Sequence, residues 1–195
     1  MVEIETPKPA EISSNPQTQL TGAAGEAMAQ VHLLMRGWIA GNINASVRNN
    51  AGFDLTATKG VRTVYIAVKA IGRGHKAQFR RPKKGKQDTL FAGGTYPDFV
   101  VFVWFIGKKE KPTEHRCFIV PTSVVDHDVL KADRHWFAHP RRDGEKRAET
   151  GTVSIGFLGN DTAGNIASNF AHKWKEYEDA WDMPEYSSST SKKPM

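Results

Sequence analysis

Residues 98–106, DFVVFVWFI, form a nearly continuous apolar run that constrains the fold more than any other part of the sequence. The run is rich in β-branched and aromatic residues, which favour strands over helices. A strand that is apolar on both faces is typical of the centre of an α/β sheet. The run is also far shorter than the ~20 apolar residues that a membrane-spanning helix needs. The sequence therefore predicts a layered α/β protein without a membrane segment.

Further helices and strands are expected on both sides of this run. Apolar residues recur mostly at spacings of three and four over residues 19–38, which predicts a helix; they are Leu20, Ala24, Ala27, Met28, Val31, Leu34, Met35 and Trp38. Strands are also expected at residues 44–48, 53–57, 61–70 and 116–120, helices at 122–130 and 163–182, and a long loop at 71–97. The predicted fold class is α/β, with a mixed sheet of about five strands flanked by helices.

The two ends of the chain differ in composition from the rest. Residues 1–18 carry three prolines and few large apolar groups, and residues 185–195 read EYSSSTSKKPM, so both are expected to be disordered tails. Residues 19–184 are then expected to form a single domain. The N-terminus lacks the apolar stretch of a secretory signal. A single cysteine, Cys117, excludes an intramolecular disulfide, and we expect a cytoplasmic location.

Positive charge is concentrated in one part of the chain. The net charge of +6 by itself indicates little more than solubility, but no acidic residue occurs between Asp54 and Asp88. A block of one sign produces a strong local field, and a polyanion such as DNA is its natural partner. A flexible, solvated loop is the alternative interpretation. The residues expected to contact nucleic acid are Arg73, Lys76, Arg80, Arg81, Lys83, Lys84 and Lys86, together with Arg141 and Arg142 in a second basic segment.

Three side chains before and within the expected hairpin have the chemistry for phosphodiester hydrolysis. That reaction needs carboxylates to hold a metal ion, an activated water and a cation near the phosphate. Asp54 and Lys69 lie on neighbouring expected strands and meet at one end if these strands form a hairpin. Glu26 joins them if its helix packs across that end. Each residue alone would be an ordinary surface side chain, and the argument rests on their order and spacing.

This order of residues resembles the PD-(D/E)xK nuclease superfamily over residues 19–121. The resemblance is carried by the motifs Gly22-Ala23-Ala24-Gly25-Glu26, Gly52-Phe53-Asp54-Leu55 and Ile66-Ala67-Val68-Lys69. It implies a restriction-endonuclease-like core of the αβββαβ type and Mg²⁺ or Mn²⁺ as the cofactor. It further implies metal ligation by Asp54, the Val68 carbonyl and Glu26, the last as in archaeal Holliday junction resolvases. Lys69 would orient the attacking water.

One residue departs from the family pattern. The superfamily has an acidic residue two positions before the lysine, where this sequence has Ala67. Alanine cannot bind a metal through its side chain, so Glu26 is the best candidate to compensate. Two hypotheses follow: a metal-dependent DNA endonuclease, or a degenerate module of the same fold that binds DNA or a partner protein. Dimers are common among nucleases that cut both strands, so a homodimer is one expected assembly.

Overall fold

The computed structural model describes residues 16–43, 52–72, 74–82, 89–91, 96–108, 111–139, 144–145, 147, 150–159 and 166–186. Its elements, in chain order, are α1 (Pro16–Met35), β1 (Ile39–Asn42), β2 (Leu55–Lys59), β3 (Arg62–Ile71), β4 (Lys76–Arg80), β5 (Phe99–Lys108), β6 (Lys111–Pro121), α2 (Thr122–Ala138), β7 (Thr152–Gly156), α3 (Phe170–Lys173), the 3₁₀ turn η1 (Lys175–Tyr177) and α4 (Met183–Tyr186). Among these helices, none is both long and apolar enough to cross a membrane.

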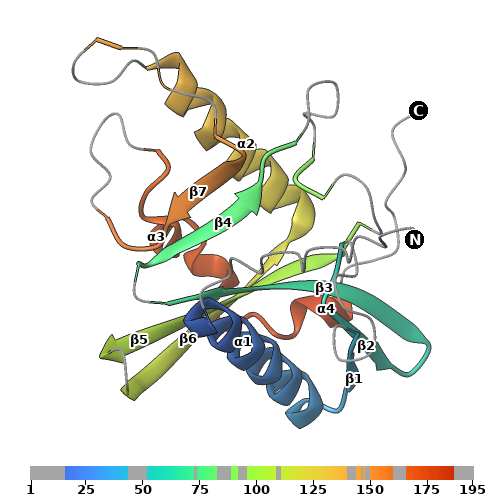
Figure 1. The fold of residues 1–195 in the computed structure, drawn as a ribbon. Coiled ribbons are helices and arrows are strands. Elements are labelled where there is room, and N and C mark those ends of the chain that lie inside the picture. Colours follow the sequence, from blue (N-terminus) through green and yellow to red (C-terminus); the bar gives the residue numbers. More distant parts are fainter. Residues whose placement is uncertain are drawn as a thin grey trace, which may run out of the picture.

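A mixed sheet of five strands, in the order β1-β2-β3-β5-β6, forms the centre of the molecule (Figure 1). β1, β2 and β3 form an antiparallel meander, β5 runs parallel to β3, and β6 returns antiparallel to β5. The four residues from Val100 to Val103 are 0% exposed, which confirms a strand buried on both faces. The architecture confirms the predicted α/β class, with a mixed sheet of five strands flanked by helices.

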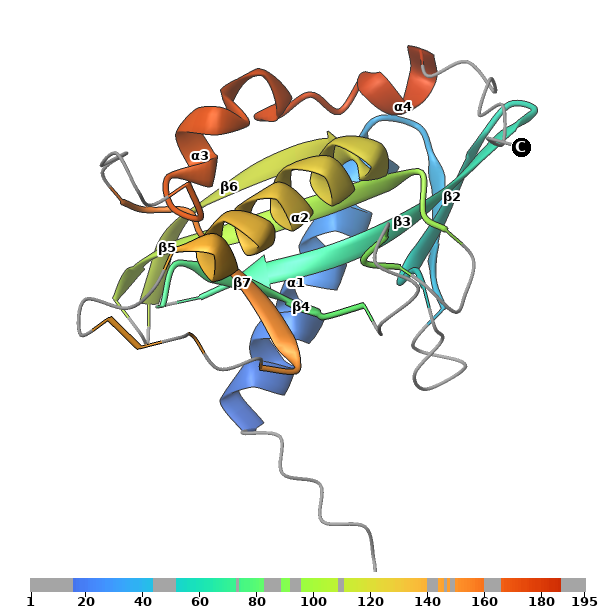
Figure 2. The same ribbon diagram turned by 90° about the horizontal axis from the view of Figure 1, so that it is seen from above.

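Helices and a small β-ribbon cover the two faces of this sheet. α1 packs on one face, whereas α2 and the β4–β7 ribbon pack on the other (Figures 1 and 2). Each face has its own hydrophobic core, centred on Leu33 and Val101 beneath α1 and on Phe102 and Trp174 beneath α2. The segment from α3 to α4 runs along the outer side of β6 (Figure 2), where Phe118 forms a β-bridge with Glu178.

Strand β4 corrects the expectation of a continuous loop at residues 71–97. It pairs antiparallel with β7, and Ala77 and Phe79 are buried while the alternate side chains are exposed. This alternation of apolar and polar residues is the pattern of a half-buried strand. The described part of the crossover from β3 to β5 thus contains a strand and no helix, which departs from the αβββαβ order. Residues 83–88 and 92–95 lie outside the described part.

Helix α1 differs from the prediction in its bounds, and part of its apolar pattern is exposed. It begins at Pro16, inside the segment expected to be a tail, and it ends before Gly37, whose φ is +78°. The side chains that face the sheet are the small or medium residues Gly25, Ala29 and Leu33. Several members of the apolar pattern are exposed, at 65% for Leu20, 46% for Val31 and 49% for Leu34, whereas Trp38 is 2% exposed.

Three further element predictions need correction or fall outside the described residues. The expected strand at 44–48 is not described, and the first strand of the sheet is β1 at residues 39–42. α2 extends to residue 138, well past the expected end at 130. Residues 163–182 do not form one helix, because left-handed backbone at Asn169 (φ +61°) and Asp179 (φ +51°) separates short helical turns.

Candidate active site

Asp54 lies directly before β2, where hydrogen bonds fix its backbone from both sides. Its N–H donates to the Ile66 carbonyl at 2.8 Å, and its own carbonyl accepts the Ile43 N–H at 3.0 Å. The carboxylate turns toward β3, where Oδ2 accepts the Val68 N–H at 2.6 Å. β3 extends past the first residue of β2, so the Val68 N–H has no β2 residue beside it. The Asp54 carboxylate accepts this N–H in place of a neighbouring strand.

Val68 presents its main-chain carbonyl to the same edge of β3. In an antiparallel pair, the N–H and C=O groups of one residue point toward the same neighbour, and Asp54 binds this N–H. The pairing of β2 with β3 ends at Leu55 and Ile66, and Ala67 is the next residue of β3. Ala67 is 3% exposed and packs in the core beneath α2. The position of the usual acidic residue therefore directly precedes Val68, whose N–H binds Asp54, but it offers only a methyl group.

Lys69 shares the sheet face of Ala67, because side chains two residues apart on a strand point the same way. Its Nζ lies 5.3 Å from the centroid of the Phe79 ring of β4, which allows a cation–π contact. Burial lowers the pKa of the Lys69 amino group, and the Asp54 carboxylate partly offsets this by favouring the charged form. The ammonium group thus lies within the electrostatic influence of Asp54, on the side covered by the β4–β7 ribbon.

Glu26 approaches this end of the sheet from helix α1. The preceding residue, Gly25, packs so closely on β3 that an added Cβ would lie 2.7 Å from the Ala70 Cβ. Glu26 Oε2 accepts a hydrogen bond from Asn42 Nδ2 at 2.8 Å, and Asn42 pairs with Leu55 at the end of β1. Because Leu55 directly follows Asp54, the two carboxylates are brought to the same end of the meander.

Asn42 is a component of this site that the sequence did not reveal. It follows Gly41 in a segment that looks like a polar turn after the helix, and an isolated asparagine in such a segment carries no specific signal. In the structure its amide orients the Glu26 carboxylate. Hydrogen bonds of this kind fix the direction in which a carboxylate presents its oxygens to a ligand.

The donor groups at this end of the sheet fit a hard divalent cation. Two carboxylates, from Asp54 and Glu26, and the Val68 carbonyl are all oxygen donors, which Mg²⁺ and Mn²⁺ prefer over nitrogen or sulfur. Mg²⁺ usually keeps several waters and needs only one or two protein carboxylates. The absence of a third carboxylate at Ala67 is therefore compatible with binding. Asp98 belongs elsewhere, because its carboxylate accepts the Tyr65 N–H on the β5 side of β3.

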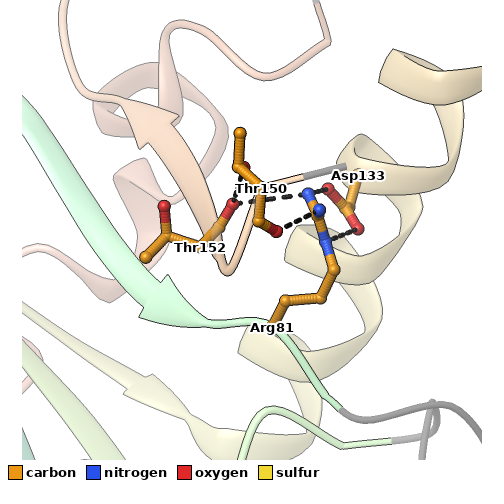
Figure 3. Close-up of polar contacts among 4 residues, drawn as sticks. All are labelled: Arg81, Asp133, Thr150 and Thr152. Carbon is orange, nitrogen blue, oxygen red and sulfur yellow. Dashed lines mark hydrogen bonds and ion pairs between the residues drawn. The ribbon is translucent and has the colours of Figure 1, made fainter. Parts of the chain in front are cut away.

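The expected phosphate-contacting residues divide into three groups. Lys76 and Arg80 are exposed on the outer face of β4, where they could reach a ligand. Arg81 is instead held within the domain: its guanidinium binds the Asp133 carboxylate at 2.8 Å and 3.2 Å and the carbonyls of Thr150 and Thr152 (Figure 3). Arg81 is therefore no longer expected to contact a phosphate. The remainder lie outside the described residues: Arg73, Lys83, Lys84, Lys86, Arg141 and Arg142.

An open groove of about 600 Å³ lies between the β4–β7 ribbon and α2. Its walls include the exposed Lys76, the paired Arg81 and Asp133, and Trp136. Asp54, Glu26 and Lys69 are not among the residues that line it. The groove and the carboxylate-bearing end of the sheet are thus separate features of the molecule.

Comparisons with known proteins find structural likeness and no sequence relative. No family model matches the chain, and no curated protein matches it either. The bacterial homing endonuclease I-Ssp6803I aligns over 85% of this chain and 89% of its own, with 12% identity and a TM-score of 0.41. The Archaeoglobus fulgidus Holliday junction resolvase Hjc aligns over 69% of this chain and 83% of its own, with 16% identity and a TM-score of 0.35.

Proposed function

We propose that this chain is a metal-dependent DNA endonuclease whose active site is the end of the β1–β2–β3 meander. The observation that carries the proposal is the hydrogen bond from the Val68 N–H to Asp54 Oδ2. It aligns a carboxylate and a main-chain carbonyl on one edge of β3, and Gly25 brings the Glu26 carboxylate close to that edge. Oxygen donors arranged in this way suit a divalent cation that acts on a phosphodiester.

Each residue of the site has a distinct role in this proposal. Asp54, Glu26 and the Val68 carbonyl hold Mg²⁺ or Mn²⁺, which would polarise the phosphate and lower the pKa of a bound water. Lys69 donates hydrogen bonds to the attacking water or to a phosphate oxygen and offsets the negative charge that develops there. Lys76 and Arg80 hold the DNA backbone through its phosphates.

A cleavage assay on supercoiled plasmid and on branched DNA, with Mg²⁺ or Mn²⁺, tests the proposal. Asp54→Asn keeps an oxygen that can accept the Val68 N–H while it removes the charge, and Lys69→Met keeps the length of the side chain. We expect both variants to lose roughly 10²-fold or more in rate, as is usual when a charged group that stabilises the transition state is removed. The matched controls are Asp182→Asn and Lys131→Met, which alter exposed side chains outside the site and should cleave normally.

The buried methyl group of Ala67 favours a second candidate function, a module of the same fold that binds DNA without cutting it. Ala67 is part of the packed core, and this position beside Val68, the residue that Asp54 binds, carries no charge. This alternative predicts binding that weakens with salt and no cleavage of either substrate by the wild-type protein. That result, obtained with DNA binding intact, would overturn the enzymatic proposal.

A further inference from the structure

Three side chains of metal-binding type converge where the C-terminal half of α1 meets β6. They are His32 of α1 and His115 and Cys117 of β6, and their ligand atoms all lie within 4.8 Å of one another. The two Nε2 atoms of the histidines are 3.0 Å apart. His115 and Cys117 are two residues apart on one strand, so both side chains point to the face that α1 covers. The cluster is separate from the Asp54 site.

Packing from three segments holds these side chains in place. The His32 ring stacks on the Trp181 ring, with centroids 4.8 Å apart and planes 12° from parallel. Trp181 and Cys117 are each 1% exposed. The C-terminal segment is tied to the same place, because the Asp179 N–H donates to the Cys117 carbonyl at 2.9 Å. His32 and Cys117 are therefore held in place, which is the condition for a preorganised ligand set, and His115 reaches them from the same strand as Cys117.

The separation of the two histidine nitrogen atoms and the chemistry of the three groups suit zinc. A tetrahedral zinc ion with Zn–N bonds of ~2.0–2.1 Å places two nitrogen ligands about 3.3 Å apart, close to the observed separation of His32 and His115. One thiolate and two imidazoles form a mixed nitrogen and sulfur set, which favours Zn²⁺ over Mg²⁺. Asp179 interacts electrostatically with both His32 and Cys117, and its negative charge would help to balance that of the ion.

We propose that His32 Nε2, His115 Nε2 and Cys117 Sγ form a zinc site that clamps α1 to β6, with water as the fourth ligand. The ion would join the helix that carries Glu26 to the far edge of the sheet. Binding at this place would stabilise the packing of α1 on β6 without contact with the Asp54 site. The inference does not depend on the proposed nuclease function.

Arg36 competes with the ion through its contact with His32. Its Nη1 lies 3.3 Å from His32 Nδ1, and since arginine only donates, this contact requires an unprotonated Nδ1. A zinc ion on Nε2 of a neutral imidazole requires the opposite, a proton on Nδ1. Arg36 also donates to the His32 carbonyl at 3.1 Å and stacks over Trp181, so it can release Nδ1 and keep these contacts. Arg36→Gln, whose amide oxygen can accept from Nδ1, should therefore increase the affinity for zinc.

Cobalt titration of the full chain tests the site directly. The experiment is performed in an Asp54→Asn background, so that the oxygen-donor site contributes little. We expect one Co²⁺ per chain, a thiolate-to-cobalt charge-transfer band in the near ultraviolet, displacement of Co²⁺ by Zn²⁺, and a higher melting temperature with Zn²⁺. Cys117→Ser should abolish the band, and His115→Gln should weaken binding at least tenfold, whereas the exposed control His172→Gln should change neither.

Two results would overturn the proposal. One is the absence of a thiolate band when Co²⁺ is in excess over the folded protein, which would leave a direct His32–His115 hydrogen bond as the role of the pair. The other is cobalt binding that Cys117→Ser and His115→Gln leave unchanged, which would mark an adventitious metal elsewhere. Because His115→Gln alters a ligand without changing the buried thiol, it keeps the test decisive even if Cys117→Ser fails to fold.

Discussion

Gly25 of α1 and Ala70 of β3 are so close that a methyl group on the glycine would lie 2.7 Å from the alanine Cβ and 3.4 Å from its Cα. Such a distance is well inside van der Waals contact, so the helix and the strand approach as closely as their backbones permit. The contact has a functional consequence, because Glu26 follows Gly25 directly. The spacing between helix and strand determines how far the Glu26 carboxylate reaches toward the end of the sheet.

Gly25→Ala should therefore destabilise the protein although alanine is the better helix former. Overpacking of a close contact typically costs ~1–3 kcal/mol, which exceeds the gain of ~0.5–1 kcal/mol from replacing a helical glycine. Gly22→Ala is the matched control, because no atom lies within 4 Å of the new methyl group and only the gain remains. Urea denaturation measures both free energies of unfolding. Equal effects of the two substitutions would show that the contact with Ala70 is not restrictive.

A second substitution should restore the packing. Ala70→Gly removes the atom that the new methyl group meets at 2.7 Å, and the next neighbours, the Cα of residue 70 at 3.4 Å and Val68 Cγ1 at 3.7 Å, are at ordinary van der Waals distances. The double variant Gly25→Ala, Ala70→Gly should be more stable than the sum of the two single effects predicts, by ~1 kcal/mol or more. A double-mutant cycle measures this coupling, and additive effects would contradict it.

The sequence predicted the sheet better than the helices around it, for a physical reason. The apolar run at residues 98–106 can be satisfied only by burial on both faces, and β5 meets this condition. The residues of the candidate site were recognisable because polar side chains lie next to apolar strands of the sheet. Asp54 and Lys69 both belong to the β2–β3 meander, whose pairing follows from the local alternation of side chains.

The apolar spacing of α1 predicted a helix but did not identify its buried face. Gly25, Ala29 and Leu33 are buried against the sheet, and larger apolar residues such as Leu20 remain exposed. Periodicity alone cannot reveal this, since a wide apolar stripe and a narrow small-residue stripe coexist on the same helix. The last predicted helix failed for another reason: its aromatic residues Phe170, Trp174 and Trp181 are buried as expected, but they fill two different cores.

The basic side chains on β4 and directly after it should have two different roles. Arg81 should stabilise the fold, whereas Lys76 and Arg80 should bind the ligand. Arg81→Gln breaks the pair with Asp133, whose side chains are only 12% and 15% exposed, and should cost about 2–3 kcal/mol of stability. Lys76→Gln and Arg80→Gln alter exposed side chains and should change stability by ~0.5 kcal/mol or less. Urea denaturation gives these values.

The effects on DNA affinity should be the reverse of those on stability. Lys76→Gln and Arg80→Gln should weaken DNA binding, whereas Arg81→Gln should not. Each exposed cation that contacts a phosphate should reduce the slope of log affinity against log salt by about one when it is removed. Arg81→Gln, measured at a temperature where the variant is fully folded, should leave that slope unchanged. A loss of DNA affinity in Arg81→Gln without a loss of stability would return Arg81 to the phosphate-contacting set.

Asp128 of α2 should make the stability of the fold depend on pH in the acid range. Its carboxylate accepts the Trp174 indole N–H at 2.8 Å and lies 2.9 Å from the Lys173 ammonium. Burial acts to raise the pKa of Asp128, but the hydrogen bonds from Lys173 and Trp174 outweigh it and hold the pKa below its unfolded value of 3.8. The stabilisation is therefore complete above pH 3.8 and is lost as the pH falls through the lowered pKa.

Asp128→Asn measures this contribution. The amide can still accept the Trp174 N–H but loses the charge that pairs with Lys173, so the variant should be less stable by ~1–3 kcal/mol near neutral pH. The difference from wild type should shrink as the pH is lowered below 3.8, since the wild-type carboxylate then becomes protonated as well. Asp182→Asn, at an exposed carboxylate, is the control. A difference that stays constant with pH would exclude an electrostatic origin.

Ala67→Glu tests whether the end of β3 still has the geometry of a metal site. The new carboxylate would directly precede Val68, whose N–H binds Asp54, in a position that is 3% exposed, so without metal it should destabilise the fold by about 3 kcal/mol through burial and repulsion. Mn²⁺ should recover part of this loss, because an ion held between two carboxylates removes both penalties. The matched variant Ala67→Gln has nearly the same size without the charge and should gain nothing from Mn²⁺. Melting temperatures with Mn²⁺ and with EDTA compare the two, and an equal metal response in both variants would mean that position 67 does not face a cation.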